Sequence, residues 1–461
     1  MPFPTANLLI SPTFTIDMYF VPLIYFASLT YYLWRRHKVF DVAVYISTLF
    51  TITSFCCVLM VLGGFMSQNS GVLFDGWDPD FGVIPTVLYC GLITVTILPF
   101  SFIRPEKLEH IGNVHRWIIL GFTLFIVLQG VLMYYLVGEF VSDLLNGDFK
   151  FLKDSHYAGD ISPADAKMLT LPAPMQAMFL LSFTTLLALP LFFYYSCVEK
   201  RSLWLTAPLL LVSISPILRG VLMADRTEII HYGLMFFFCL VFFQRFITKK
   251  VRNFLLTLSV PTIAVGLIYF VAVSASRFED DEEGAGGSVL EYAGQSYANF
   301  CYFYENHDPD LYYIERELPI ISYFLLNNQY VDTKEERTAK EGFFVGVFAS
   351  HVGSWMLDLG VAGGIFLSFL FAGLCCVVIW RYNRTSFDVA DVLMIYTLGA
   401  VPTFGIFYYR YYSIATAIVY VAAGFLFLCS KIDFVWKKEE DTEAEVEPLL
   451  TDSETSEIVR S

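Results

Sequence analysis

One apolar run indicates the class of protein, since residues 352–380 read VGSWMLDLGVAGGIFLSFLFAGLCCVVIW and contain a single charged residue, Asp358. A helix needs roughly 20 apolar residues to cross about 30 Å of hydrocarbon. The whole 461-residue chain is similar, because 56% of its residues are hydrophobic and 17% are aromatic. Its mean hydropathy is +0.59. This composition excludes an ordinary soluble globular protein and predicts a membrane protein.

Similar apolar runs recur along the chain. They predict an all-α, polytopic membrane domain over residues 1–436 with about eleven transmembrane helices. The expected spans lie near 13–34, 41–66, 84–103, 117–140, 175–198, 203–219, 229–247, 253–275, 352–380, 387–408 and 411–430. Prolines at positions 208, 216 and 402 are the only notable breaks expected within these spans.

The distribution of Lys and Arg predicts the orientation of the spans. With the N-terminus outward, 16 of these residues fall on inward flanks and 6 fall in the short outward loops. Translocation of positive charge is disfavoured, so we expect an outward N-terminus and a cytoplasmic C-terminus. Two sizeable outward loops follow from this topology, at about 141–174 and 276–351.

The formal net charge of -15 comes mainly from two segments. Residues 277–341 carry 15 acidic and 5 basic side chains, and residues 437–461 carry 9 acidic and 3 basic ones. The rest of the chain is close to neutral, so nothing indicates binding to nucleic acid. Residues 437–461 are expected to form an acidic, disordered cytoplasmic tail, and a partner-binding role for this tail is the alternative.

Arginine is rare on the outward side but stands at the outward ends of several spans. Ionisable groups at this depth are costly and point to function. Because guanidinium groups bind phosphate oxygens through paired donors, their convergence predicts a pocket for a lipid diphosphate. The alternative is that each arginine extends to headgroup phosphates or pairs with Asp225 or Glu228. The arginines are Arg219, Arg226, Arg277 and Arg410.

A histidine stands where the long outward loop re-enters the membrane. His351 belongs to the segment FASHVGSWMLDLGVAGG, residues 348–364. An imidazole accepts a proton near neutral pH or, when charged, holds a phosphate. Asp358, about two helical turns further on, lies on the same helix face and belongs to the same expected pocket. The alternative for His351 is a hydrogen-bonded interfacial residue without a catalytic role.

The outward loop also contains an aromatic stretch, residues 290–304, which reads LEYAGQSYANFCYFY. Aromatic faces beside amides suit sugar rings, which makes Tyr292 and Asn299 candidates for substrate binding. Amphipathic packing on the membrane surface explains the same composition equally well.

Three of these elements resemble the oligosaccharide repeat-unit polymerases of the O-antigen polymerase and ligase superfamily. They are Arg219-Gly220 at a hairpin, Arg277 at the start of the large loop, and the segment from His351 to Gly364. The resemblance implies a GT-C-like membrane glycosyltransferase in which Arg219 and Arg277 engage the lipid diphosphate and His351 assists the acceptor hydroxyl. Arg226 and Arg410 match no motif of the family, and we expect them to assist in substrate binding.

The implied reaction moves a chain from a polyprenyl (undecaprenyl) diphosphate onto the terminal sugar of a second lipid-linked unit. It takes place at the outer face of a bacterial inner membrane, without a metal or cofactor, in surface polysaccharide biosynthesis such as O-antigen, lipopolysaccharide or capsule. The donor, the acceptor and the lipid bilayer are the expected partners. Whether a regulator of chain length also binds is left open. The alternatives are a ligase that uses the same pocket and a transporter or lipid flippase.

Overall fold

The computed structural model of the chain is mostly helical. It describes residues 13–63, 82–113, 115–146, 181–201, 203–222, 227–249, 251–253, 284–306, 348–380, 386–411 and 416–431, together with residues 172, 176, 178, 255 and 257. Most of the expected span at 253–275, most of the loop at 141–174 and the whole tail at 437–461 lie outside these residues. The number of eleven spans therefore stays a prediction.

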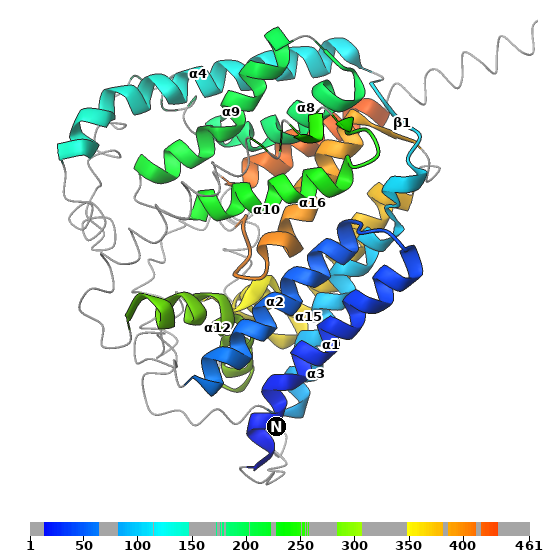
Figure 1. Cartoon of the computed structure of the whole chain (residues 1–461), viewed down its shortest axis with the longest axis vertical. Coiled ribbons are helices and arrows are strands. Elements are labelled where there is room, and N and C mark those ends of the chain that lie inside the picture. The colour runs from blue at the N-terminus through cyan, green and yellow to red at the C-terminus, as the bar shows by residue number, and fades with distance from the viewer. Residues whose placement is uncertain are drawn as a thin grey trace, which may run out of the picture.

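The helices form two groups that pack against each other (Figure 1). One group contains α4 (Arg116–Asn146), α8 (Ala188–Phe193), α9 (Leu203–Leu222), α10 (Thr227–Phe242) and α16 (Val389–Phe404). The other contains α1 (Thr13–His37), α2 (Val42–Leu62), α3 (Val83–Ile97), α12 (Gly284–Asn306) and α15 (Ser350–Trp380). Short helical segments extend α3 and flank α8, namely η1 (Leu98–Phe102), η2 (Pro105–Lys107), η3 (Ser182–Leu187) and η4 (Tyr194–Val198).

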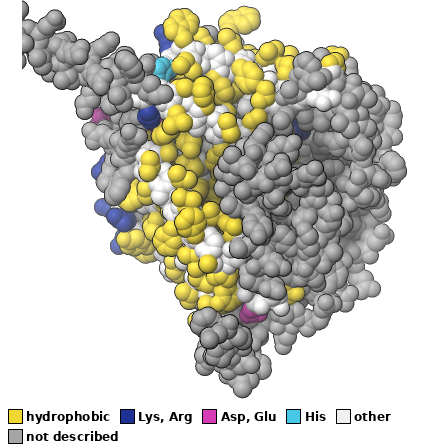
Figure 2. Space-filling model, turned by 180° about the vertical axis from the view of Figure 1, so that it is seen from behind, with side chains coloured by type: hydrophobic (Ala, Val, Ile, Leu, Met, Phe, Trp, Pro, Cys, Tyr) yellow, Lys and Arg dark blue, Asp and Glu magenta, His cyan; other side chains and the backbone are white. Residues whose placement is uncertain are grey.

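Five of the described helices are long and apolar enough to cross a membrane: Val42–Leu62, Val83–Lys107, Arg116–Tyr135, Leu203–Gly220 and Ser350–Ile379. Four shorter apolar helices accompany them, Ser182–Val198, Thr227–Phe242, Val389–Phe404 and Thr416–Lys431. In Figure 2 the described part of one face is covered largely by hydrophobic side chains, and Lys and Arg lie along one edge of it. Exposed apolar side chains on this scale suit contact with lipid and would be unfavourable in water. The expected class, a helical membrane protein, is confirmed at this level.

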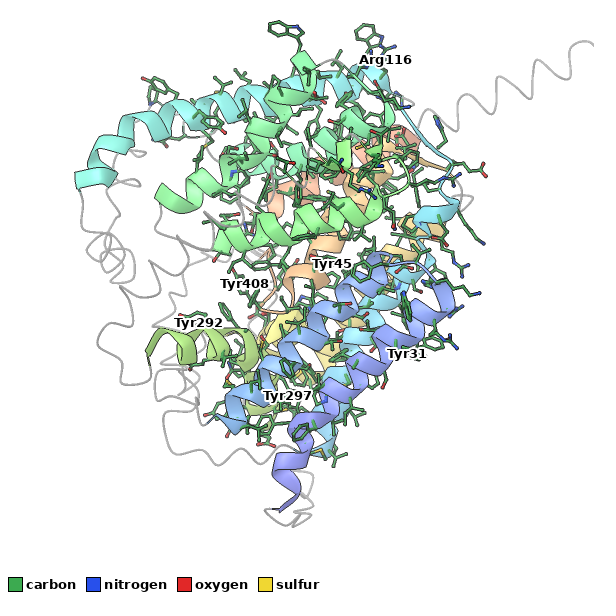
Figure 3. The ribbon with its side chains drawn as sticks, in the orientation of Figure 1. Tyr31, Tyr45, Arg116, Tyr292, Tyr297 and Tyr408 are labelled. Atoms are coloured by element: carbon green, nitrogen blue, oxygen red, sulfur yellow. The ribbon has the colours of Figure 1, made fainter. Side chains whose placement is uncertain are left out.

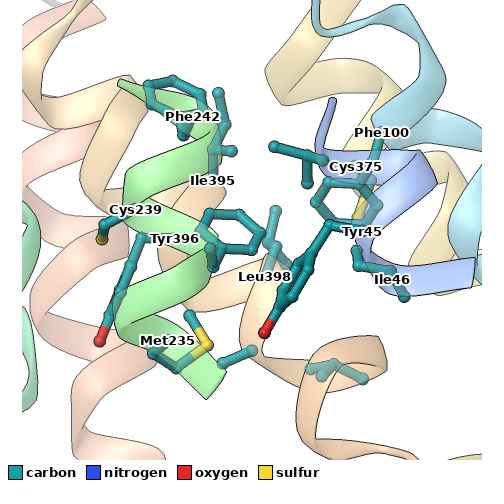
Figure 4. Close-up of a cluster of buried hydrophobic side chains, with 14 of the residues drawn as sticks. Tyr45, Ile46, Phe100, Met235, Cys239, Phe242, Cys375, Ile395, Tyr396 and Leu398 are labelled. Carbon is teal, nitrogen blue, oxygen red and sulfur yellow. The ribbon is translucent and has the colours of Figure 1, made fainter. Parts of the chain in front are cut away.

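A buried hydrophobic cluster joins the two helix groups (Figure 4). Tyr45 of α2 meets α10, where its hydroxyl donates a hydrogen bond of 2.8 Å to the carbonyl of Leu234. Phe238 of α10 and Tyr396 of α16 pack edge to face with ring centroids 6.2 Å apart. Because the described helices share this core, residues far apart in sequence are brought together at both ends of the bundle.

One end of the bundle, here called the strand end, contains the only strands that the described residues form. Strand β1 (His110–Gly112) pairs in parallel with β2 (Ser386–Asp388). Asp388 then caps α16, with Asp391 completing a capping box. Lys431 donates a 2.5 Å hydrogen bond to Asp391, so the helix Thr416–Lys431 also ends here. Several flanks that are predicted to lie inward therefore meet at one end.

Glu199 forms a partly exposed polar cluster at the strand end. It accepts hydrogen bonds from Tyr194 at 2.6 Å, Arg201 at 2.6 Å and Asn113 at 3.4 Å. Partial burial alone would raise the pKa of the Glu199 carboxyl, but these hydrogen bonds lower that pKa overall. The contacts tie the chain after η4 to the residues after β1.

The aromatic stretch of the expected outward loop forms part of the bundle, because α12 packs against α2, α3 and α15. A Cβ atom on Gly294 of α12 would lie 2.7 Å from the backbone nitrogen of Cys57 in α2, so α12 and α2 approach each other closely there. Tyr297 is buried, and its hydroxyl lies 2.6 Å from that of Thr86 (Figure 3). The aromatic residues around Tyr297 are therefore largely occupied with helix packing.

α15 is interrupted at Gly360, which has φ 69° and ψ 179°. This region of backbone conformation is accessible almost only to glycine. The expectation that prolines 208, 216 and 402 mark the notable breaks was wrong, because these prolines lie inside α9 and α16 while α15 breaks at a glycine. An apolar run conceals such a break, since a glycine there does not interrupt the hydropathy.

Candidate functional site

Two of the predicted arginines meet at one carboxylate, and we call Arg219, Glu228 and Arg410 the arginine cluster. Nη2 of Arg219 donates to Oε1 of Glu228 at 3.0 Å, and Nη2 of Arg410 donates to the same oxygen at 2.5 Å. Arg219 lies in the last turn of α9, Glu228 in the first turn of α10, and Arg410 in the segment after α16. The helix ends thus bring Arg410 to a carboxylate that is 182 residues away in the chain.

The arginine cluster is enclosed by protein. Arg219, Glu228 and Arg410 have exposed fractions of only 5%, 5% and 3%. Cζ of Arg219 lies 3.4 Å from the centre of the Phe183 ring, and Cζ of Arg410 lies 5.6 Å from that of Phe404. Two guanidinium groups share one carboxylate, so the three side chains carry a net charge of about +1. The pairing with Glu228, which the sequence left open as the structural alternative, is present.

His231 belongs to the same region and was not singled out in the sequence. It stands three residues after Glu228 on α10 and is 1% exposed. Its ring packs edge to face on Phe404, with centroids 5.4 Å apart, and its Nε2 has no hydrogen-bond partner among the described residues. Residues three apart lie on neighbouring positions of a helix surface, so the spacing from Glu228 was the signal in the sequence.

His351 lies at the start of α15 and is fully buried. Its Nε2 is 3.1 Å from the hydroxyl of Thr96, and its Nδ1 is 3.3 Å from the carbonyl oxygen of Gly405. The ring packs edge to face on Trp355 at 5.1 Å. Both ring nitrogens are therefore within hydrogen-bonding distance of protein groups, an arrangement that also suits the structural alternative for this histidine.

The first turns of α15 are bonded to the segment that carries Arg410. The amides of Ser350 and His351 donate to the carbonyls of Phe407 at 2.7 Å and Gly405 at 3.0 Å. The amide of Tyr409 donates to the hydroxyl of Ser354 at 3.2 Å. His351 thus reaches the neighbourhood of the arginine cluster through the backbone, although no direct contact between them is present. Asp358, in the same part of α15, is fully buried.

The two candidates on α12 lie at this same end of the molecule. Tyr292 packs on Phe348, whose ring stacks on Tyr408, so α12 and the segment after α16 are adjacent (Figure 3). Asn299 is buried and donates to the carbonyl of Phe348 at 2.8 Å and to the side chain of Gln295 at 3.0 Å. The donors of the Asn299 amide are thus engaged within the protein. Substrate binding by Tyr292 and Asn299 stays a prediction.

Two further predicted site residues, Arg226 and Arg277, lie outside the described residues. The expected convergence of Arg219, Arg277 and His351 on one cavity therefore stays a prediction, and Arg219 and Arg410 are the pair that the structure brings together. Within the described ranges, no group of three His, Cys, Asp or Glu side chains is arranged to hold a metal ion.

The fold and the site define an α-helical membrane protein with a buried arginine–carboxylate cluster at one end of its helices. No family model, curated protein or solved structure matches the chain. The chemistry of the site must therefore be argued from its own residues.

Proposed function

We propose that the protein is a membrane glycosyltransferase that polymerises oligosaccharide units carried on a polyprenyl diphosphate. The observation that carries this proposal is the meeting of Arg219 and Arg410 on one carboxylate at the end of the bundle opposite the strands. A diphosphate leaving group gains negative charge as the glycosidic bond to it breaks. Buried guanidinium groups, positioned in advance, stabilise such charge far better than they would in water.

The carboxylate of Glu228 supports this assignment because it is bound by the two arginines as a phosphate group would be. Its Oε1 accepts from both guanidinium groups, in the way that a phosphate oxygen accepts from paired arginines. Each guanidinium has five N–H donors, so an incoming phosphate can share the arginines with Glu228 or replace it. The net positive charge of the cluster favours the anionic donor over a neutral sugar lipid.

The remaining roles in the proposal follow the resemblance. Arg277 and Arg226 would add positive charge around the diphosphate, and His351 would assist the acceptor hydroxyl. With the arginine cluster outward, the strand end faces the cytoplasm, in agreement with its basic flanks. The reaction would then take place at the outer face of a bacterial inner membrane.

The decisive experiment uses single lipid-linked units, extracted from the host after deletion of the gene. Purified protein in lipid nanodiscs should elongate these units in the absence of any other acceptor. Arg410→Ala should lower the rate of elongation by roughly 100-fold, because it removes one donor to the leaving group. Lys431→Ala is the matched control, since it breaks a buried ion pair of the same length at the strand end. Failure of the wild-type protein to elongate the units would refute the proposal.

A transporter is the second candidate, and the interruption of α15 at Gly360 favours it. Transporters often bind their substrates at discontinuous membrane helices. Proteoliposomes that contain only this protein and labelled lipid-linked units distinguish the two functions. Movement of unelongated units across the bilayer indicates transport, whereas elongation indicates polymerisation. A ligase would transfer the label only after a second class of acceptor is added.

A further inference from the structure

Two polar atoms on one turn of α10 are buried and have no hydrogen-bond partner within the part of the chain that the structure describes. They are Oε2 of Glu228 and Nε2 of His231, and their side chains are 5% and 1% exposed. A buried polar atom that lacks a partner is unfavourable, so such atoms are rare in proteins and call for an explanation. A ligand hydroxyl suits this pair, since it can donate its hydrogen to either of the two acceptors.

These two atoms lie beside the groups that would hold the diphosphate. Oε1 of Glu228 is used by both guanidinium groups, which leaves Oε2 of the same carboxylate for another donor. Phe404 lies against both Arg410 and His231, at 5.6 Å from Cζ and 5.4 Å between ring centroids. The cationic and the proton-accepting groups therefore form one continuous cluster.

We infer that His231 is the proton acceptor for the sugar hydroxyl of the acceptor and that Glu228 supports it. The inference rests on the proposed polymerase function. It names the residue that would activate the acceptor, beside the arginines that would stabilise the leaving diphosphate. In the tautomer that carries hydrogen on Nδ1, Nε2 of His231 presents a lone pair to the hydroxyl. The carboxylate of Glu228, one turn earlier, offsets part of the repulsion between the two guanidinium groups and the imidazolium that results.

The bonds of this step balance without any further reactant. The hydroxyl oxygen of the acceptor forms a bond to the anomeric carbon of the donor, and its proton passes to Nε2 of His231. The bond from the anomeric carbon to the diphosphate oxygen breaks, and its electron pair remains on the diphosphate. Arg219 and Arg410 stabilise that charge, and the proton later leaves His231 for solvent.

His351 is less suited to this role. Its two ring nitrogens face the hydroxyl of Thr96 and the carbonyl of Gly405, at 3.1 Å and 3.3 Å. A proton acceptor needs a nitrogen that the substrate can reach within hydrogen-bonding distance. Within the described ranges Nε2 of His231 has no hydrogen-bond partner, whereas both nitrogens of His351 lie within hydrogen-bonding distance of one.

The test measures elongation of single lipid-linked units by nanodisc-embedded protein. His231→Ala should lower turnover by roughly 100-fold, the typical contribution of a positioned general base. Added imidazole should restore part of that activity, because it can enter the space and accept the proton. His231→Gln preserves hydrogen bonding and much of the side-chain volume, so this variant should fold normally. An amide is not a base in water, so the variant should not recover turnover. His110→Ala, which removes an exposed histidine of β1, is the control; it should keep wild-type turnover, and added imidazole should not alter that turnover.

Any one of three results would overturn the inference. They are wild-type turnover in His231→Ala, restored turnover in His231→Gln, and the absence of rescue of His231→Ala by imidazole. In all three cases the wild-type protein still elongates the units, so the polymerase proposal survives. If the wild-type protein elongates nothing, the proposed function itself has failed. The two failures are thereby distinguishable.

Discussion

The strand end and the arginine cluster differ in how their charged side chains are paired. At the strand end, Glu199 pairs with Arg201 two residues away, at the partly exposed end of the bundle. In the arginine cluster, one buried carboxylate serves two guanidinium groups, 9 and 182 residues away. The ion pairs at the strand end, Glu199–Arg201 and the more distant Asp391–Lys431, each match one cation with one anion and are therefore neutral. The arginine cluster retains positive charge, and this difference is the reason that we propose it as the functional site.

The largest effect expected from this comparison concerns Glu228. Glu228→Ala leaves two buried guanidinium groups without their shared carboxylate, and breaking a buried pair typically costs about 3–5 kcal/mol. Thermal unfolding in detergent should show a large fall in Tm. Arg201→Ala is the matched control at the strand end, where solvent screens an exposed pair and its loss should change Tm little. Equal losses in both variants would contradict the contrast between the two ends.

A second prediction tests whether the segment before Arg410 is rigidly packed. A Cβ atom on Gly405 would lie 2.3 Å from Nδ1 of His351, so Gly405→Ala should overpack the site and cost about 1–3 kcal/mol. The measurements are Tm and the rate of elongation, both of which should fall. Gly424→Ala meets no atom within 4 Å and should leave both nearly unchanged. A neutral Gly405→Ala would show that His351 is loosely held.

The third prediction concerns the hydrogen bond beneath His351. Thr96→Val removes the hydroxyl that lies 3.1 Å from Nε2, at an expected cost of about 1 kcal/mol. Thr48→Val provides the comparison, since the Thr48 hydroxyl bonds only to its own helix, at the carbonyl of Val44. If Thr96→Val is no less stable than Thr48→Val, the contact contributes nothing to the folded state.

The smallest expected effect is the pH dependence of the strand end. Because the pKa of Glu199 is lowered in the folded protein, its stabilising contribution is present above the ordinary pKa of a glutamate and is lost as pH falls through the lowered value. Glu199→Gln should therefore reduce the loss of Tm between neutral pH and about pH 3. Solvent screens this partly exposed group, so the change is small. An identical pH profile in the variant would rule out this contribution.

The sequence predicted well what depends on local composition. Apolar runs identified the helices, and Arg219 and Glu228 were recognisable as neighbours because a short hairpin joins their spans. Arg410 was a candidate, but its partner could not be inferred because the contact requires α9, α10 and α16 to pack together. His231 was overlooked because it lies in an apolar helix, where a histidine resembles ordinary core. The burial of α12 was equally hidden, since helix packing and surface binding select similar aromatic residues.

The interruption at Gly360 divides α15 into two helical parts. Three hydrogen bonds join the first part, residues 350–359, to the segment 405–409 that immediately precedes Arg410. The second part, 361–380, packs closely on the first, because Cβ atoms on Gly363 and Gly364 would lie 2.2 Å from Cβ of Leu359 and 2.7 Å from Cγ of Met356. A side chain at position 360 would strain the backbone at this junction, and the three hydrogen bonds connect the junction to the segment before Arg410.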